Sequence, residues 1–419
     1  MNNPQQQLND FLMDHMLHPA CYHWEEELER FMAEMDAVRN GKQGSVKMIP
    51  YWMGKPLFKP ESVLAIDIGG TYVKSAWISL NESGVVEMKH LPPFLTPGVN
   101  DSMNSELFFQ KIVAPIGSYL ETEKIGICFS LATIPQKNRD AVVSASAKQL
   151  CVTDLLGVKV GQSFCKAADA LGFRHDQEIV VINDTVAAML SGRCEHQNLV
   201  YDGYIGFIYG TGTNLAYQEP GGELINIESG AYCGFPCGDI DDRFDASLVD
   251  AEQDRFEKMV SGGYQGGLMT AILQAAVNEN LLSEDFYDRL FVTEDNPLTA
   301  EDISGFFRSD AAENRISLAC TDQAERALLT SLFDAVTARS ALLCSVTVTG
   351  ALLRAQIGKT KLTPAYITAE GSTYQKQKGF RENLDTCMQQ IAGNRFGLHY
   401  EFQTVRDAVL KGTALASLT

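Results

Sequence analysis

The chain has 419 residues, of which 45% are hydrophobic and 21% are charged, and its formal net charge is −19. This length suits two domains or lobes better than a single core, and the composition is that of a well-packed globular enzyme. The acidic balance excludes a sequence-independent grip on nucleic acid, which requires a basic surface. It leaves a nucleotide substrate open, because backbone N–H groups, Mg²⁺ and a few lysines can hold phosphates on an otherwise acidic protein.

The chain is expected to work in the cytoplasm and away from membranes. No segment approaches 18 consecutive apolar residues, so a membrane span is not expected. The first 16 residues lack the basic flank and the apolar block of a signal peptide. The ten cysteines are scattered, and the closest pair, Cys233 and Cys237, has no second pair or histidine cluster to complete a zinc set. Free thiols in a reducing compartment are therefore expected.

The first 100 residues predict a helix followed by a β-hairpin. Apolar residues within 21–36 recur at spacings of four, three and four, which predicts an amphipathic helix. Residues 63–66 read as a buried strand, and residues 73–78 read as a second strand after a two-glycine turn. Residues 81–100 are rich in glycine, proline and polar side chains, and they predict a loop with at most one short strand.

Strands and helices alternate in the next part of the chain. A helix is predicted over residues 104–120, and Pro115 is expected to bend or shorten it. Residues 125–129 and 179–182 are short β-branched strands, with a helical stretch on either side of the second. A hairpin followed by such alternation fits a mixed sheet covered by helices.

From residue 204 the pattern begins again. Residues 205–209 and 215–218 read as strands, and residues 210–213 form a glycine–threonine turn between them. The two hairpins suggest a duplicated architecture with a cleft between the halves, although two unrelated hairpins fit the spacing equally well. A long helix through 329–351 and a short helix of small residues at 411–416 are predicted in the remainder.

The first glycine turn follows an acidic residue at the end of a buried strand. Asp67 stands just before Gly69, Gly70 and Thr71. A carboxylate buried there needs a compensating cation or donors, and the glycines let backbone N–H groups approach a phosphate. Asp67 therefore suits a hydrated Mg²⁺, which keeps several waters and takes one or two carboxylates. On this segment alone, a tight hairpin with an aspartate capping its turn is an equally good interpretation.

The second turn and a further aspartate extend the pattern. Residues 210–214 form a second glycine turn, and together with the first turn they would bind one polyphosphate from two sides. Asp184 follows the strand at 180–182 and precedes an apolar helix at 186–190. It is either an N-cap or, if it faces the cleft, a base that accepts a hydroxyl proton during phosphoryl transfer.

Taken together, these segments resemble the hexokinase family, in order, from about residue 46 to 416. The matching segments are two phosphate turns, a catalytic segment, two sugar-contacting segments and an adenosine-binding turn, at 67–71, 209–217, 181–187, 226–232, 256–264 and 369–374. The resemblance implies an α/β fold of the actin-like ATPase (ribonuclease H-like) type, with two lobes, each a mixed β-sheet flanked by helices, and a cleft between them. It implies a small lobe of 61–183 plus 405–419 and a large lobe of 1–60 plus 184–404.

The resemblance also implies a reaction and its site residues. The reaction is ATP-dependent phosphorylation of the 6-hydroxyl of a hexose, glucose above all, as the first step of glycolysis, with Mg²⁺ as cofactor. Asp184 would be the general base, and Lys148 would neutralise the migrating phosphoryl group. Sugar hydroxyls would be bound by Ser130, Asn183, Asn214, Glu228 and Glu257. The nucleotide would meet Asp67, Gly69, Gly70, Thr71, Lys74, Thr211, Gly212, Gly262, Gly263, Gly371 and Ser372, with Asp67 reaching the metal through water. A monomer or homodimer without nucleic-acid or membrane partners is expected.

Two departures from the family's pattern leave the preferred sugar open. Ala147 stands beside Lys148 where the family has a threonine, and Ala132 stands where it has a proline. One lost sugar contact typically costs about 0.5–1.5 kcal/mol. An alternative hypothesis is a catalytically weak sugar-sensing protein of the same fold, which the retention of Asp184, Lys148 and both phosphate turns disfavours. Another actin-like ATPase is a third, but it would not need Glu228 and Glu257.

Overall fold

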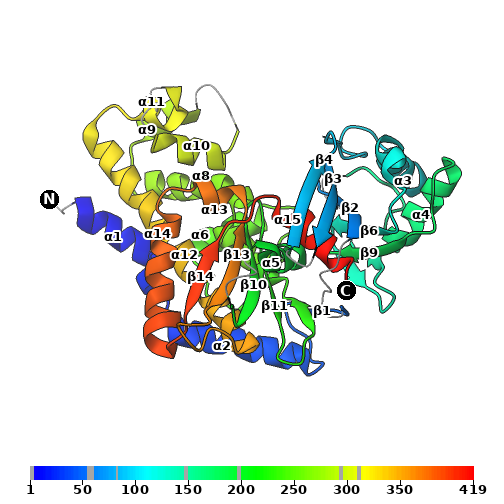
Figure 1. The fold of residues 1–419 in the computed structure, drawn as a ribbon. Coiled ribbons are helices and arrows are strands. Elements are labelled where there is room, and N and C mark those ends of the chain that lie inside the picture. Colours follow the sequence, from blue (N-terminus) through cyan, green and yellow to red (C-terminus); the bar gives the residue numbers. More distant parts are fainter. Residues whose placement is uncertain are drawn as a thin grey trace.

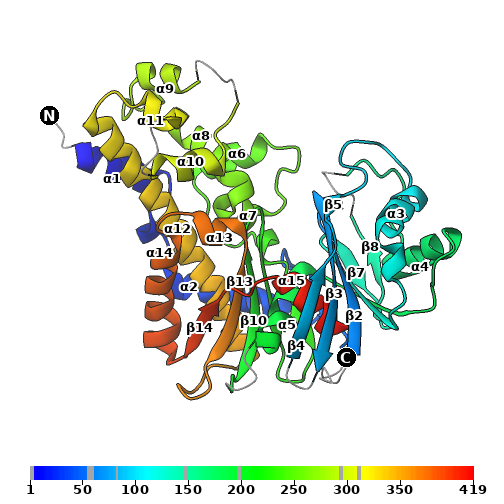
Figure 2. The ribbon, with the colours of Figure 1, turned by 45° about the horizontal axis from the view of Figure 1, so that its top comes forward.

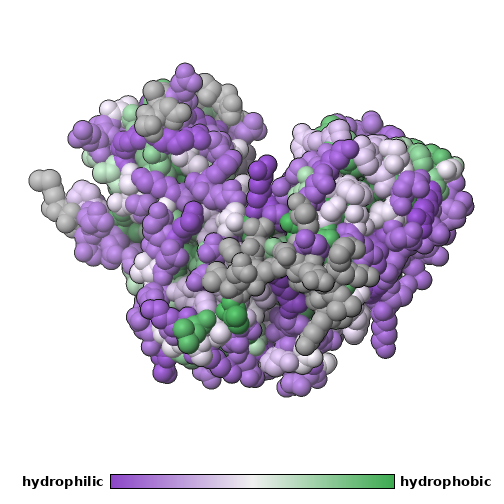
Figure 3. Space-filling view, in the orientation of Figure 1, coloured by the Kyte–Doolittle hydropathy of each residue, from purple (hydrophilic) through white to green (hydrophobic). Residues whose placement is uncertain are grey.

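A computed structural model describes residues 4–53, 61–81, 84–145, 150–195, 200–291, 296–308 and 313–419. Within these ranges, two mixed six-stranded sheets lie side by side, each with helices on its outer face (Figure 1). A small two-stranded sheet, β7 (Thr133–Pro135) with β8 (Ala141–Val143), extends from the first. On the face seen in Figure 3, hydrophilic residues predominate, in keeping with the acidic composition.

The first sheet is built around the predicted hairpin. Its strands run in the order β4-β3-β2-β6-β9, and β5 pairs with β3 off this path. Their bounds are β2 (Glu61–Ile68), β3 (Tyr72–Asn81), β4 (Gly84–His90), β5 (Phe94–Leu95), β6 (Lys124–Phe129) and β9 (Glu178–Ile182). The β2–β3 and β3–β4 pairs are antiparallel, whereas β2–β6 and β6–β9 are parallel. Because both faces of β2 are covered, residues 63–66 are completely buried.

The second sheet repeats this arrangement. Its strands run in the order β1-β12-β11-β10-β13-β14. Their bounds are β1 (Ile49–Tyr51), β10 (Gly203–Tyr209), β11 (Thr213–Gln218), β12 (Leu224–Asn226), β13 (Ala365–Glu370) and β14 (Tyr400–Gln403). Again antiparallel pairings precede two parallel ones, since β12 pairs antiparallel with β1 and β11, β11 pairs antiparallel with β10, and β13 pairs parallel with β10 and β14. The predicted duplication is therefore confirmed.

Two helices pack against each other between the sheets (Figure 2). Helix α5 (Asp184–Glu195) lies on β10 and β13, and α15 (Ala408–Ala416) lies on β2 and β6. Their contact is close, because a Cβ on Gly412 would lie only 1.8 Å from the carbonyl oxygen of Ala187. The small residues predicted at 411–416 thus serve helix packing.

The remaining helices cover the outer faces. The first sheet is flanked by α3 (Ser105–Val113) and α4 (Val160–Ala170). The second is flanked by α2 (Trp24–Arg39), α12 (Gln323–Ala355) and α14 (Phe380–Met388), and α13 (Ser372–Lys376) follows β13. A second helical cluster, to which the first half of α12 also contributes, consists of α1 (Pro4–Asp14), α6 (Asp239–Ala246), α8 (Gly262–Asn278), α9 (Glu284–Phe291), α10 (Ala300–Phe306) and α11 (Arg315–Ala319). Helix α7 (Arg255–Val260) packs its apolar side chains into the core behind the second sheet.

One helix of the described residues is long and apolar enough to cross a membrane. This is α12, and 83% of its apolar window is buried inside the fold. Its composition is therefore accounted for by its position, because it packs on α2, α14 and β11 in the core behind the second sheet.

Two predictions about the first half have different outcomes. The prediction of at most one short strand in 81–100 is wrong, because both β4 and β5 lie there. Strand β4 is an edge strand with Glu87 and Lys89 exposed to solvent, and such charged edges weaken the apolar alternation by which a strand is recognised. The effect predicted for Pro115 is confirmed, because α3 ends at Val113 and continues as a 3₁₀-helix over Ala114–Tyr119. The division of the chain into lobes stays a prediction.

Candidate active site

A polar cavity of about 270 Å³ lies where the two sheets meet. Its walls include all six residues that were predicted to bind the sugar or to act as base: Ser130, Asn183, Asp184, Asn214, Glu228 and Glu257. Ser130 and Asn183 follow the neighbouring parallel strands β6 and β9, whose carboxyl ends meet at one edge of the first sheet. Asn214 and Glu228 come from the second sheet and the segment after it. Sequence reasoning therefore grouped these residues correctly, whereas their individual roles stay predictions.

Asp184 is both the first residue of α5 and a wall of the cavity. Its Oδ1 accepts hydrogen bonds from the Thr185 backbone N–H at 2.7 Å and from the Thr185 hydroxyl at 3.2 Å. The side chain of Asn183 accepts a bond from the same N–H at 2.8 Å. Burial raises the pKa of the Asp184 carboxyl, and the bonds from Thr185 oppose that rise. Asn183 is thus the N-cap of α5, because its side chain accepts from the Thr185 N–H and its carbonyl accepts from the Ala187 N–H at 3.0 Å. The interpretation of Asp184 as the N-cap is therefore wrong, and Asp184 faces the cavity as the first residue of the helix.

Asp67 lies at the end of β2, next to Ser130, whose hydroxyl donates to Asp67 Oδ1 at 3.5 Å. Burial raises the pKa of Asp67 from 3.8 to about 6, and the negative charge of Asp184 adds to the rise. Lys74, the cross-strand partner of Asp67 on β3, lowers it. A cation bound beside Asp67 would favour its ionised form and offset the effect of burial and of the Asp184 charge.

A metal ion bound near Asp67 would have few protein ligands. In the part of the chain that the structure describes, no three His, Cys, Asp or Glu side chains form a group that could hold one. The donor set around Asp67 nevertheless fits Mg²⁺, which is commonly held by one or two carboxylates, waters and substrate phosphates.

All ten cysteines are free thiols.

Asn214, Asn226 and Glu228 form a connected network on the second sheet. Asn226 donates to Glu228 Oε1 at 2.6 Å and accepts from Asn214 at 2.8 Å. The Asn214 oxygen accepts from the backbone N–H groups of Leu215, at 2.7 Å, and Ser229, at 3.2 Å. Burial raises the pKa of Glu228, and the Asn226 bond opposes this. The network fixes the orientation of two predicted sugar-binding side chains.

Glu257 reaches the cavity from α7 and meets the second glycine turn. Its Oε2 accepts a hydrogen bond from the Thr213 backbone N–H at 2.9 Å. The two residues beside this oxygen, Gly212 and Gly230, have no side chains. A Cβ on Gly212 would lie 2.4 Å from the oxygen, and a Cβ on Gly230 would lie 3.0 Å from it. Glycine at 212 thus makes room for Glu257, whereas its contact with a phosphate stays a prediction.

The predicted nucleotide residues of the second sheet are assembled around residues 210–213. The backbone N–H groups of Gly262 and Gly263, at the start of α8, donate to the carbonyls of residues 210 and 211 at 2.8 and 2.9 Å. Gly371, with φ +124°, packs so closely on this turn that a Cβ would lie 2.2 Å from the Tyr209 carbonyl oxygen. Thr211, Gly263 and Ser372 are exposed around the turn. The three segments therefore meet as predicted.

The first turn carries the remaining nucleotide residues. It is closed by a bond from the Gly69 N–H to the Tyr72 carbonyl at 3.1 Å. Gly70 is half-buried, and the side chains of Thr71 and Lys74 are exposed to solvent. Through Asp67 and Ser130 this turn adjoins the cavity. Lys148 lies outside the described residues.

Sequence reasoning missed three polar residues of the cavity wall: Tyr51, Thr133 and Asn226. Tyr51 is 3% exposed and comes from β1, the edge strand that opens the second sheet. Burial and the charges of Glu228 and Asp184 raise the pKa of its hydroxyl. Asn226 stands within a segment that resembles the family, whereas Tyr51 stands outside the matching segments, and neither residue type alone signals a sugar site.

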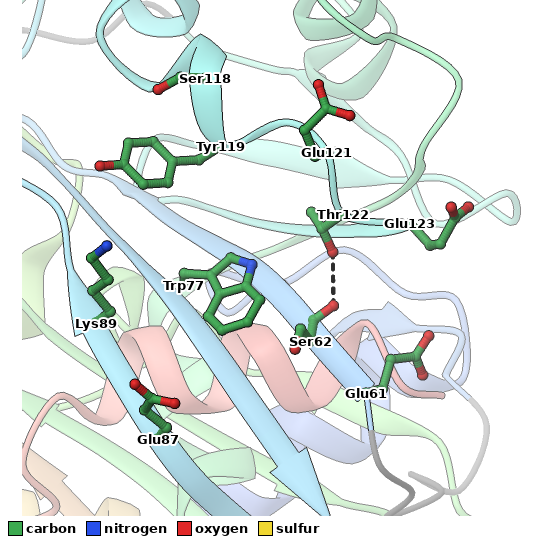
Figure 4. A pocket seen from close by; sticks show the side chains of 10 residues that line it. All are labelled: Glu61, Ser62, Trp77, Glu87, Lys89, Ser118, Tyr119, Glu121, Thr122 and Glu123. Atoms are coloured by element: carbon green, nitrogen blue, oxygen red, sulfur yellow. Dashed lines mark hydrogen bonds between the residues drawn. The ribbon is translucent and has the colours of Figure 1, made fainter.

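A second cavity, of about 650 Å³, lies on the α3 side of the first sheet (Figure 4). Trp77 and Tyr119 contribute aromatic surface, and Glu87, Lys89 and Glu121 surround it. It contains none of the predicted site residues and shares no wall residue with the smaller cavity. The residues predicted for catalysis therefore gather in the smaller, more polar of the two.

Two solved structures of sugar kinases match the fold of this chain. A hexokinase from Schistosoma mansoni complexed with glucose matches with a TM-score of 0.78 and 19% identity over 100% of both chains. A ROK family glucokinase from Streptomyces griseus, in complex with glucose and AMPPNP, matches with a TM-score of 0.51 and 15% identity over 84% of this chain and 98% of the other. The fold is thus the predicted actin-like ATPase fold, with mixed sheets flanked by helices.

Comparison of the amino-acid sequence with family models identifies the family of this chain. Two family models, both described as hexokinase, match residues 12–194 and 204–419. The chain belongs to the hexokinase family. It is 25% identical to hexokinase-2 of Equus caballus over 93% of this chain and 46% of that protein, and 23% identical to hexokinase-1 of Nicotiana tabacum over 84% and 78%. The chain spans about half the length of the mammalian relatives it matches.

Proposed function

We propose that the protein is an ATP-dependent hexose kinase that phosphorylates the 6-hydroxyl of its sugar, with glucose the expected substrate. The observation that carries the proposal is the single cavity that joins Asp184 to Ser130, Asn183, Asn214, Glu228 and Glu257. Amides, carboxylates and a hydroxyl in fixed positions are what the many hydroxyls of a sugar require. Membership of the hexokinase family supports the same reaction.

The chemistry follows from the environment of Asp184. Its carboxylate would accept the proton of the sugar's 6-hydroxyl as the oxygen–phosphorus bond forms, and its raised pKa suits a base near neutral pH. The Thr185 bonds would hold that carboxylate in place throughout. Because phosphoryl transfer passes through a loose transition state, positioning and charge neutralisation contribute more than basicity.

The nucleotide would lie across the two glycine turns. Backbone N–H groups around residues 69–71 and 211–212 would approach its phosphates, with Lys74 close by, and the rim at Gly263 and Ser372 would receive the nucleoside. Asp67 would hold Mg²⁺ through water, and the metal would offset charge on the phosphates. The lobes, 61–183 plus 405–419 and 1–60 plus 184–404, would close over both substrates and exclude water. A cytoplasmic monomer or homodimer is proposed.

The test is a coupled assay for ADP with glucose, fructose, mannose and N-acetylglucosamine, each with and without Mg²⁺. Sugar-dependent and Mg²⁺-dependent ADP formation, with the sugar 6-phosphate as product, is the expected result. Binding of a hexose without ADP formation would refute the kinase proposal and favour a sugar sensor. Formation of ADP at one rate with and without sugar would refute it in favour of a simple ATPase.

A further inference from the structure

Asn226 is a buried side chain at the centre of the polar network in the smaller cavity. It is the last residue of β12, pairs with Ala216 on β11, and is 1% exposed. Its amide nitrogen donates to Glu228 Oε1 at 2.6 Å, and its amide oxygen accepts from the Asn214 nitrogen at 2.8 Å. Each end of the amide is therefore committed to one predicted sugar-binding residue.

These bonds leave Glu228 and Asn214 little freedom. Asn214 cannot turn its amide over, because its oxygen already accepts from the Leu215 and Ser229 N–H groups. Glu228 has a backbone φ of +55°, which is uncommon for a residue with a side chain, so its carboxylate leaves the chain in a fixed direction. With Oε1 engaged by Asn226, and at 3.4 Å by Asn214, the other oxygen, Oε2, remains as an acceptor.

We infer that Asn226 is a positioning residue for the sugar: it holds the Glu228 carboxylate and the Asn214 amide in the orientation that accepts sugar hydroxyls. This inference rests on the proposed function. Asn226 acts through its two neighbours, and a wrong rotamer of either would leave a sugar hydroxyl or a buried carboxylate without its partner. Loss of these contacts should weaken sugar binding more than nucleotide binding.

The charges around Glu228 give the role a pH signature. The negative charges of Asp184 on α5 and of Asp254, just before α7, both raise the pKa of Glu228. Glu257 on α7 and Tyr51 on β1 line the same cavity. The bond from Asn226 acts in the opposite direction, because it favours the ionised carboxylate. Loss of that donor should make Glu228 protonate at a higher pH and lose its acceptor role there.

The experiment uses the full chain with Asn226→Asp, which keeps the shape but replaces the donor with an oxygen. Asn383→Asp is the matched control, because the Asn383 amide of α14 is half-buried and donates to the Gly379 carbonyl at 2.8 Å. For Asn226→Asp we expect the KM for hexose to rise about tenfold or more, the usual worth of a bond to a charged group. The KM for ATP should stay within about twofold, and the acid limb of kcat/KM should move to higher pH.

The control variant should show neither change. Equal hexose KM values and equal acid limbs for Asn226→Asp and the wild type would overturn the inference, and so would equal rises in both KM values. Asn226→Ser is assayed as a second variant, because its smaller side chain keeps one hydroxyl donor. If the aspartate variant folds poorly, the serine variant still tests the inference. Wild-type turnover of the hexose separates the hypotheses: its absence refutes the proposed function, whereas normal wild-type turnover with unchanged variants refutes only the role of Asn226.

Discussion

The carboxylate of Glu257 accepts a hydrogen bond at 2.9 Å from the backbone N–H of Thr213, and this bond joins α7 to the second glycine turn. The same turn is predicted to hold phosphate, and the same carboxylate is predicted to hold sugar. Position 212 belongs to the turn and also contacts this carboxylate. A side chain at 212 would place its Cβ only 2.4 Å from Glu257 Oε2. The bond therefore couples the places where the two substrates would meet.

Gly212→Ala should displace Glu257 without unfolding the protein. The atom in the way is the end of a side chain that can turn aside, but turning breaks its bond to Thr213. We expect the KM for hexose to rise about tenfold, as for the loss of a bond to a charged group. Gly221→Ala is the matched control, because a Cβ there would meet nothing within 4 Å. An unchanged hexose KM in the Gly212 variant would show that Glu257 does not bind the sugar.

Asp67→Asn should stabilise the fold while abolishing activity. The pKa of Asp67 in the folded protein is about 6, raised from 3.8, so the folded state binds its proton more tightly than the unfolded chain does. Wild-type stability contributed by this group is thus present below about pH 4 and is lost as pH rises through about 6. At pH 7.5, without nucleotide, the free energy of unfolding of the variant should exceed the wild-type value by about 3 kcal/mol.

Urea unfolding at pH 7.5 and at pH 5 measures the effect. The advantage of Asp67→Asn should shrink at pH 5, where the wild-type carboxyl is largely protonated, and ADP formation should be lost at both values. A variant that is less stable than the wild type at pH 7.5, or one that retains activity, would contradict the account of Asp67.

His15 should make the stability of the N-terminal helix depend on pH. Its ring nitrogens contact Asp239 at 2.6 Å, on α6, and Glu279 at 2.7 Å, after α8. Burial alone would lower the pKa of His15, but the hydrogen bonds and charges of the two carboxylates outweigh burial and raise it. The stability it contributes is therefore fully present below about pH 6.5 and is lost as pH rises through the raised value.

His15→Gln should lose about 1 kcal/mol of unfolding free energy at pH 6, because both carboxylates are half-exposed. The loss should be smaller at pH 9, because the wild-type ring releases its proton as the pH rises through its raised pKa. Thermal unfolding across this range gives the measurement, and His175→Gln, at an exposed position, provides the control. A difference that is the same at pH 6 and pH 9 would show that His15 contributes by packing alone.

The sequence predicted the central hairpins and the set of site residues because both depend on local patterns. Residues 63–66 and 205–209 are apolar runs that end in glycine turns, and the structure has a strand at each. Asp184, Glu228 and Glu257 were grouped by resemblance, since stretches so far apart in the chain carry no spacing rule that joins them. Only the fold brings them to one cavity.

Other features had no local signal. At most one short strand was predicted where β4 and β5 both lie, because the charged edge side chains of β4 hide the alternation and a two-residue strand such as β5 has no period. Tyr51 and Asn226 reach the cavity because strand pairing brings them there, and pairing partners such as β1 with β12 are set by tertiary structure. Polar residues whose role is to hold other residues are the hardest to predict, since their chemistry becomes visible only with their partners.

Turnover of Asp184→Asn tests the central claim most directly. The asparagine keeps the shape and can still accept the Thr185 N–H bond, so the fold and the hexose site should persist, which unfolding and sugar-binding titrations check. With saturating hexose and Mg·ATP, we predict that kcat falls about a hundredfold or more, the usual worth of a positioned base. A well-folded variant whose kcat stays close to that of an active wild type would contradict the assignment of Asp184 as the base.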